Sequence, residues 1–307
     1  MGKKKNKIRK KKAKKNSPLR AIGILLGLLA LMGLILMPKA NPEEWKVSPD
    51  GLLEYPAKRS RIDCQRTPLE DGDDYTLDKV IFESKGLTVY GLLRIPKGVK
   101  NPPGMVLLPG AQVTKEGQQA LAKSMQKLGY ASLSLDQRGH GETGGYVASM
   151  EEDFRSFIGD VEPVQHKMVY DALRAVDCMG TFDELDHKRI YIGGESMGGR
   201  FAIIAGGIDK SIAGVLAIST SGYRLPSGLP SDQLRFFTSI DPNSYISKIS
   251  PRKLVMIHSK NDSVVPIDDA RITFEKAHEP KAFYTIKVGT HHGYHPDMDE
   301  YIKTEFG

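Results

Sequence analysis

The feature of this chain that most constrains its fold is a regular alternation of short apolar segments with helical segments. The apolar segments have the length of buried strands and lie at residues 105–110, 131–136, 189–194, 212–220, 253–259 and 281–289. Residues with helical spacing lie at 115–130, 163–179, 196–207 and 268–279. Two earlier segments, 78–85 and 87–96, predict a hairpin that turns at Lys85-Gly86. Strands that alternate with helices predict an α/β fold, with a mostly parallel central sheet covered by helices on both faces.

Two stretches do not follow this alternation. Residues 38–77 are rich in proline, charged residues and turn residues, and they predict a stalk and the lead-in to a domain at 78–307. Residues 221–250 contain proline, glycine and paired aromatic residues, and they predict a small cap over a site. Three aromatic side chains of this cap either line an acyl pocket or pack structurally: Tyr223, Phe236 and Phe237.

The N-terminus differs chemically from the rest of the chain. Of the 44 Lys and Arg residues, 12 lie in residues 1–40, which contain no Asp or Glu. The remainder therefore carries 32 basic residues against 37 acidic ones, a net charge of −5. A mildly acidic body argues against nucleic-acid binding. Residues 1–20 are polar and strongly cationic, and they predict a disordered cytoplasmic tail.

Residues 21–37 form an apolar run of 17 residues without a charge. As a helix this run extends about 26 Å at about 1.5 Å per residue, near the short limit for a membrane span. It predicts an uncleaved transmembrane signal anchor; a cleaved signal peptide and a buried core helix are the alternatives. The 11 positive charges before the run predict a cytoplasmic N-terminus at the cell membrane and a domain on the extracytoplasmic side.

The strongest chemical motif is Gly-Gly-Glu-Ser-Met-Gly-Gly at residues 193–199, between a predicted strand and a predicted helix. In a G-x-S-x-G motif of this kind the serine lies on a tight turn that exposes its hydroxyl, and small neighbours avoid a clash. A glycine-rich turn with a capping serine gives the same letters by chance. The strand before the motif and the helix after it favour Ser196 as a nucleophile.

A serine nucleophile needs a base and an acid that orients the base. Asp262 follows the predicted strand 253–259 and is the candidate acid, with Asp136 and Asp241 as weaker alternatives. Three histidines follow the last predicted strand and are candidates for the base: His291, His292 and His295.

Taken together, these motifs resemble the α/β-hydrolase superfamily, especially its dienelactone-hydrolase-like and prolyl-oligopeptidase-like branches. The matching pieces are GGESMGG, DQRGHGET at 136–143, HSKNDSVVP at 258–266 and HHGY at 291–294. They occur in the family's order and cover most of residues 78–307. The resemblance implies the α/β-hydrolase fold and a Ser-His-Asp triad.

The resemblance also assigns roles to single residues. It implies His292 as the base, because this histidine directly precedes Gly-Tyr, as in the family's His-Gly-aromatic motif. His291 is the runner-up, and His295 is expected at the surface or beside the site. For Asp136 and Arg138, the resemblance implies a mostly structural role that ties loops together.

An oxyanion hole needs two backbone N–H donors. One is expected from Met197, which follows the nucleophile. The other is expected from the loop after residues 105–110, where the family usually has His-Gly and this chain has Pro109-Gly110-Ala111-Gln112. The N–H of Ala111 is the best candidate, and the Gln112 side chain is a possible addition.

The sequence thus predicts a membrane-anchored serine hydrolase that cleaves esters, or amides, of small molecules. A peptidase for short peptides is the second hypothesis, and a non-catalytic binding module on the same fold is the third. No motif indicates a metal or a cofactor. Cys64 and Cys178 are the two cysteines of the chain, and they can form at most one disulfide.

Overall fold

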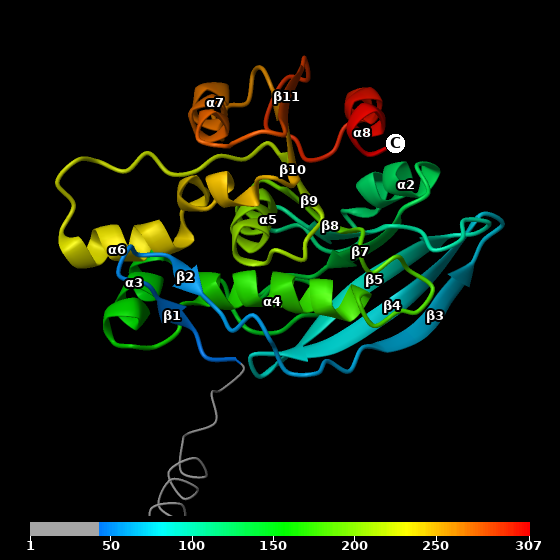
Figure 1. Ribbon diagram of the computed structural model, residues 1–307, viewed down its shortest axis with the longest axis horizontal. Helices are drawn as coiled ribbons and strands as arrows, with labels where there is room; N and C mark the ends of the chain where they lie inside the picture. Colours follow the sequence, from blue (N-terminus) through cyan, green and yellow to red (C-terminus); the bar gives the residue numbers. More distant parts are fainter. Residues whose placement is uncertain (1–42) are drawn as a thin grey trace, which may run out of the picture. The chain divides into compact units, whose positions relative to one another are not determined.

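The computed structural model describes residues 43–307, and within them nine strands form one sheet (Figure 1). The order of the strands is β11-β10-β9-β8-β6-β7-β5-β4-β3. Six of them pair in parallel: β6 (Gly104–Leu108), β7 (Ala131–Leu135), β8 (Ile190–Glu195), β9 (Gly214–Ile218), β10 (Lys253–Ser259) and β11 (Lys281–Ile286). The other three pair antiparallel at one side of the sheet: β5 (Leu87–Pro96), β4 (Tyr75–Ser84) and β3 (Gln65–Asp71). The predicted mostly parallel sheet and the predicted hairpin are both confirmed.

Each face of the sheet has its own hydrophobic core. Successive side chains of a strand point to opposite faces, and β6 shows this division: Val106 and Leu108 belong to one core, and Met105 and Leu107 to the other. Helices from either side complete the two cores. The first is covered by α4 (Val164–Met179), α5 (Met197–Ile208) and α7 (Ile267–Glu275), and the second by α2 (Gln119–Lys127) and α8 (Asp299–Phe306).

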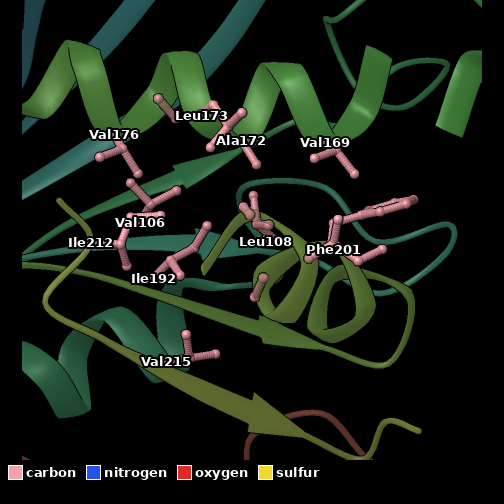
Figure 2. Close-up of a cluster of buried hydrophobic side chains, with 14 of the residues drawn as sticks. Val106, Leu108, Val169, Ala172, Leu173, Val176, Ile192, Phe201, Ile212 and Val215 are labelled. Carbon is pink, nitrogen blue, oxygen red and sulfur yellow. The ribbon is translucent and has the colours of Figure 1, made fainter. Parts of the chain in front are cut away.

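Figure 2 shows the first core between α4 and the sheet. The side chains that meet there are fully or almost fully buried: Val169, Ala172, Leu173 and Val176 from α4, Val106 and Ile192 from β6 and β8, and Phe201 from α5. Because α5 begins at the nucleophile motif, its packing against α4 and the sheet fixes the position of Ser196.

The predicted cap at residues 221–250 contains α6 (Ser231–Ile240) and two short 3₁₀ helices, Pro242–Ser244 and Ile246–Ile249. α6 packs against α3 (Met150–Ile158) through a small aromatic cluster. Phe236 is fully buried in this cluster against Phe154 and Phe157, so it packs structurally and does not line a pocket. The second of these 3₁₀ helices, Ile246–Ile249, is part of the first core, where Ile246 and Ile249 are buried beside α5.

Residues 43–77 correct the prediction of a stalk over residues 38–77. They form the small hairpin of β1 (Lys46–Val47) and β2 (Leu53–Glu54) and the edge strand β3. Leu53 and Tyr55 are buried in the first core, and Cys64 forms a disulfide with Cys178 at the end of α4. The segment therefore belongs to the domain. Isolated apolar residues among polar ones bury it against the first core, and isolated apolar residues give no periodic pattern in the sequence.

The predicted cationic tail at 1–20 and the predicted span at 21–37 lie outside the described residues. Within residues 43–307, none of the helices combines the length and the apolar character that a membrane crossing requires.

Candidate active site

Ser196 lies at a sharp turn between the end of β8 and the start of α5. Its backbone has φ 52° and ψ −115°, a positive-φ conformation that residues other than glycine rarely adopt. Two hydrogen bonds hold this turn against the end of β9. The Ser196 N–H donates to the Ile218 carbonyl at 2.8 Å, and the Thr220 hydroxyl donates to the Ser196 carbonyl at 2.7 Å. The turn presents a half-buried serine at the carboxyl edge of the parallel strands.

Glycines on both sides of Ser196 are required by close backbone contacts. A Cβ atom at Gly194 would lie 2.3 Å from the Gly198 carbonyl oxygen. A Cβ atom at Gly198 would lie 2.2 Å from the Leu108 carbonyl oxygen. The G-x-S-x-G spacing therefore has a steric cause here, and the prediction of a strand-to-helix turn at Ser196 is confirmed.

The structure places His291, and not His292, against the serine. His291 Nε2 lies 2.9 Å from Ser196 Oγ, and His291 Nδ1 lies 2.7 Å from Asp262 Oδ2. An ionised carboxylate only accepts, so the Nδ1–H donates to Asp262 and Nε2 accepts the hydroxyl proton of Ser196. The neighbouring His292 instead places its Nε2 at 3.4 Å from Thr290 Oγ1. The prediction of His292 at this position is wrong by one residue, because the loop turns the His292 side chain away from the serine.

Asp262 occupies the position predicted for it, in the loop after β10. Its side chain is fully buried, and Oδ1 accepts the N–H groups of Val264 at 2.9 Å and Val265 at 2.8 Å. The buried His258 supports the same loop, since its Nε2–H donates to the Val265 carbonyl at 2.8 Å. Burial lowers the pKa of His258, so this imidazole is neutral near pH 7. The acid is thus held by a network that leaves Oδ2 for His291.

The two alternative acids lie elsewhere. Asp136 accepts the backbone N–H and the Nζ of Lys115, at 2.8 and 2.7 Å, and the Glu142 N–H at 2.8 Å. Asp241 accepts the N–H groups of Tyr223 and Asn243. Within residues 43–307 neither carboxylate is bonded to a histidine.

Arg138 ties separate loops together, as the resemblance implied. Its Nε and Nη2 donate to the two oxygens of Asp171 at 2.6 and 2.9 Å, and Nη2 also donates to the Ser84 carbonyl at 2.7 Å. This contact joins the loop after β7 to α4 and to the hairpin of β4 and β5.

The loop after β6 lies beside the nucleophile. A Cβ atom at Gly110 would lie 3.5 Å from the Ser196 Cβ. The next residues are fixed by His140, whose Nε2 accepts the Gln112 N–H at 2.9 Å while Nδ1 lies 3.0 Å from the Arg138 carbonyl. The Gln112 N–H is therefore engaged. Among residues 43–307, no hydrogen-bond partner occupies the N–H of Ala111 or of Met197, as the predicted oxyanion donors require.

The cap meets α5 near the same edge of the sheet. Tyr223 Oη lies 3.2 Å from Arg200 Nη1, and its ring centroid lies 4.5 Å from the guanidinium carbon. Phe237 packs against Tyr223 with 6.0 Å between ring centroids. These aromatic residues join the cap to the helix that carries the nucleophile.

Two residues at the site were not predicted from the sequence. His140, which fixes the loop after β6, lies in DQRGHGET, but nothing in that motif identifies its partner. Glu195 precedes the nucleophile inside GGESMGG, and its charge within an otherwise small and apolar motif was the available signal. In the described part of the chain, no group of three or more His, Cys, Asp or Glu side chains could hold a metal ion.

Comparisons with known proteins find similarity in sequence and in fold. The sequence model of the acetyl xylan esterase family (AXE1) matches residues 72–221. The acetyl xylan esterase from Paenibacillus sp. R4 superposes with a TM-score of 0.69 at 19% identity, over 80% of this chain and 89% of that one. The chain has the α/β-hydrolase fold. In α/β-hydrolases the nucleophile, the acid and the histidine follow one another in that order, and Ser196, Asp262 and His291 do so here.

Two further proteins are similar to the chain in fold or in sequence. Acetyl xylan esterase 1 from Thermoanaerobacterium sp. JW/SL YS485 has a TM-score of 0.64 at 13% identity, over 81% of this chain and 89% of that one. Uncharacterized protein YfhR of Escherichia coli O157:H7 is 28% identical over 134 residues, which are 42% of this chain and 47% of that protein. The chain therefore spans about half the length of this curated relative.

Proposed function

We propose that the chain is a serine hydrolase that cleaves esters of small molecules through an acyl-enzyme intermediate. The observation that carries the proposal is the His291 side chain, which lies 2.9 Å from Ser196 Oγ and 2.7 Å from the buried Asp262. A nucleophile, a base and an acid in this arrangement have the geometry that acyl transfer needs. The match to the acetyl xylan esterase family supports ester hydrolysis as the general class of reaction.

In the first half of the reaction, Ser196 Oγ attacks the ester carbonyl carbon and its proton passes to His291 Nε2. The bond from that carbon to the alcohol oxygen then breaks, and His291 returns the proton to the departing alkoxide. In the second half, His291 takes a proton from water, and the hydroxide attacks the acyl carbon. The carbon–Oγ bond breaks and Ser196 regains its proton. Asp262 keeps the imidazole in the Nδ1–H tautomer and stabilises its charged form.

The oxyanion of each tetrahedral intermediate is assigned to the N–H groups of Met197 and Ala111. Met197 is the first residue of α5, so its N–H is free of intrahelical bonding and lies at the positive end of the helix dipole. Ala111 follows Gly110, which lies against Ser196. Removal of one such donor in other hydrolases costs about 10² to 10³ in kcat.

The substrate is proposed to be an ester with a short acyl group. The family model named for acetyl xylan esterases supports this choice, and so do the acetyl xylan esterases among the solved structures.

A fluorophosphonate probe tests the proposal directly, because it phosphonylates an activated serine. We expect covalent labelling of the wild-type domain and none of Ser196→Ala. A series of p-nitrophenyl esters should give the highest kcat/KM with acetate and a fall with longer acyl chains. Aminoacyl-p-nitroanilides cleaved faster than the esters would favour the peptidase instead, and an unlabelled wild type that binds ligands would favour a non-catalytic module.

The loop that carries Ala111 depends on His140, which gives a prediction for this residue. Since His140 accepts the Gln112 N–H at 2.9 Å, His140→Ala should release the loop and lower kcat by about tenfold, less than the full loss of an oxyanion donor. KM should change little, because the loop acts on the transition state. His278→Ala, at an exposed histidine, is the control. Equal kcat in the two variants would contradict the role of His140.

For localisation, we propose that residues 21–37 anchor the chain in the cell membrane and that the catalytic domain lies outside the cytoplasm. The support is the uncharged run of 17 apolar residues and the cationic segment before it. The disulfide between Cys64 and Cys178 is independent support, because disulfides persist in oxidising compartments.

This topology predicts that the protein stays in the membrane pellet through high-salt and carbonate washes, since apolar burial is not screened by salt. Protease added to cells with an exposed outer face should digest the domain. A variant that begins at residue 38 should be released and active. A protected domain would reverse the orientation, and a mature N-terminus at or after residue 38 would establish cleavage.

A further inference from the structure

Glu195 is a buried carboxyl group directly between the nucleophile and the loop that carries His291. Only 7% of the residue is exposed, and within residues 43–307 it forms no ion pair with Lys or Arg. Burial raises the pKa of Glu195. A carboxyl group buried without a cation opposes folding unless hydrogen bonds compensate for its lost hydration. Its retention beside Ser196 therefore calls for a physical explanation.

Both carboxyl oxygens of Glu195 are used as acceptors. Oε1 accepts the backbone N–H of Tyr294 at 2.8 Å, and Oε2 accepts the side-chain amide of Gln118 at 2.7 Å. Tyr294 lies three residues after His291 in the same loop, and Gln118 lies at the start of α2. A single side chain thus joins the nucleophile turn, the histidine loop and a helix of the opposite face.

Gly293 shows how closely the histidine loop lies against this carboxyl group. A Cβ atom at Gly293 would lie 2.2 Å from Glu195 Oε2 and 2.6 Å from its Cδ. A larger residue here would have to displace the Glu195 carboxyl group, so glycine lets the loop lie this close to it. The backbone at residues 293 and 294 is fixed by steric contact on one side and by a hydrogen bond on the other.

We propose that Glu195 is a positioning residue, which sets the histidine loop so that His291 Nε2 meets Ser196 Oγ. The inference rests on the proposed function, because the alignment matters for catalysis only if Ser196 and His291 react. Glu195 is covalently adjacent to Ser196. A displacement of the end of β8 therefore moves Ser196 together with the carboxyl group that holds the histidine loop.

The contacts by which Glu195 holds the loop are hydrogen bonds, which a neutral side chain can also form; its electrostatic interaction with His291 is not needed for them. The other amide atom of the Gln118 side chain, Oε1, is buried and has no hydrogen-bond partner within residues 43–307. If the Gln118 amide turns over, this oxygen can accept from a protonated carboxyl group or from the amide of Glu195→Gln. The oxygen that faces Tyr294 is unchanged in both cases. The neutral isostere can therefore keep both contacts.

The kinetics of two substitutions separate a role of Glu195 through hydrogen bonds from a role through its charge. Glu195→Ala should lower kcat by about 10², the cost of a misplacement of roughly 1 Å at a reacting group, with little change in KM. Glu195→Gln should restore kcat to within about threefold of wild type and leave the pH profile of kcat/KM in place. A Glu195→Gln variant as slow as Glu195→Ala, or one with its profile moved to lower pH, would show a role of charge and overturn the proposal.

Gly293→Ala tests the same contact from the loop side. Its Cβ would strike the carboxyl group, so this variant should also lose about 10² in kcat. Glu195→Ala removes the atoms that the new Cβ would strike. The double variant Glu195→Ala/Gly293→Ala should therefore be no slower than either single variant. Independent, multiplicative losses would mean that the two residues do not act through their contact.

Hydrogen exchange provides a readout that does not depend on catalysis. The Tyr294 amide and its neighbours in residues 290–296 should exchange at least tenfold faster in Glu195→Ala than in wild type or Glu195→Gln. Asp153→Ala is the matched control, because Asp153 is also a buried carboxyl group that accepts two backbone N–H groups. It lies in α3, and its two donors lie at the start of α4. This control variant should leave exchange at 290–296 unchanged.

The two proposals fail in different ways. A wild type that neither cleaves esters nor labels with a fluorophosphonate would refute the hydrolase, while the exchange experiment would still decide whether Glu195 holds the loop. Unchanged exchange at residues 290–296 in Glu195→Ala would refute the positioning role, even in an active enzyme.

Discussion

His291→Ala should lower kcat/KM for p-nitrophenyl acetate by about 10³ to 10⁶, whereas His292→Ala should change it by less than about tenfold. The two residues are neighbours in sequence, but only His291 is bonded to both Ser196 and Asp262. Loss of His291 removes the acceptor for the serine proton. Loss of His292 removes a contact to Thr290 at 3.4 Å. Initial rates at saturating ester concentration measure kcat, and those at low ester concentration measure kcat/KM.

The triad also predicts strong non-additivity. Ser196→Ala should be as slow as His291→Ala, and the double variant should be little slower than either, because each single change disables the same unit. Asp262→Asn should lower kcat less than the removal of the base His291 does. His292→Ala serves as the matched control for removal of an imidazole from this loop. An inactive His292→Ala beside an active His291→Ala would show that the loop rearranges when substrate binds. Full activity of Ser196→Ala would refute the mechanism.

The difference between the two histidines shows what the sequence could predict at this site. The strand, the glycines and the serine of GGESMGG predicted the turn correctly, because a tight strand-to-helix turn needs small residues on both sides of the nucleophile. The contact of Gly194 with Gly198 lies within the motif, whereas Gly198 also lies against the Leu108 carbonyl at the end of β6. The acid was predicted because it follows a buried strand. The prediction of the histidine was wrong by one position, because the loop places the His291 side chain against Ser196 and Asp262. The spacing within HHGY does not encode this loop conformation.

The fold was predictable where strands and helices have a strong period. The parallel strands, the hairpin and the helices α2, α4, α5 and α7 all overlap segments that the apolar pattern indicated, with ends that differ by up to a few residues. The same argument failed for residues 43–77. There, Leu53 and Tyr55 are isolated anchors, and β3 is an edge strand that is mostly exposed. An edge strand that buries neither face has no apolar alternation to detect.

Polar contacts also hold this segment, and the sequence could not have paired them. Arg59 donates to Asp177 at 2.7 Å and to Asp209 at 2.5 Å, and its side chain is only 8% exposed. Arg174 donates to the Ser60 carbonyl at 2.7 Å. These partners are more than 100 residues apart in the chain. Their pairing follows from the position of α4 and not from any local motif.

The disulfide between Cys64 and Cys178 provides the second large prediction, because it closes a loop with a sequence separation of 114 residues. In the chain-entropy account, a cross-link over about 100 residues lowers the conformational entropy of the unfolded chain, which stabilises the fold by about 4.7 kcal/mol. Removal of a native disulfide typically costs about 2–5 kcal/mol of stability. We expect Cys64→Ala/Cys178→Ala to lower the free energy of unfolding by about that amount. Urea denaturation of a domain that begins at residue 38 measures the change, and Tm should fall by about 5–15 °C.

The single variants and a reductant make this prediction specific to the bridge. Cys64→Ala and Cys178→Ala should each destabilise the domain about as much as the double variant, since either change opens the same loop. Reductant should destabilise the wild type by a similar amount and leave the double variant unaffected. Below their melting temperatures all of these variants should keep the wild-type kcat, because Cys178 lies in the last turn of α4, before the start of β8, whereas Ser196 follows the end of β8. A wild type whose urea midpoint does not respond to reductant would mean that the two thiols are not bridged in solution.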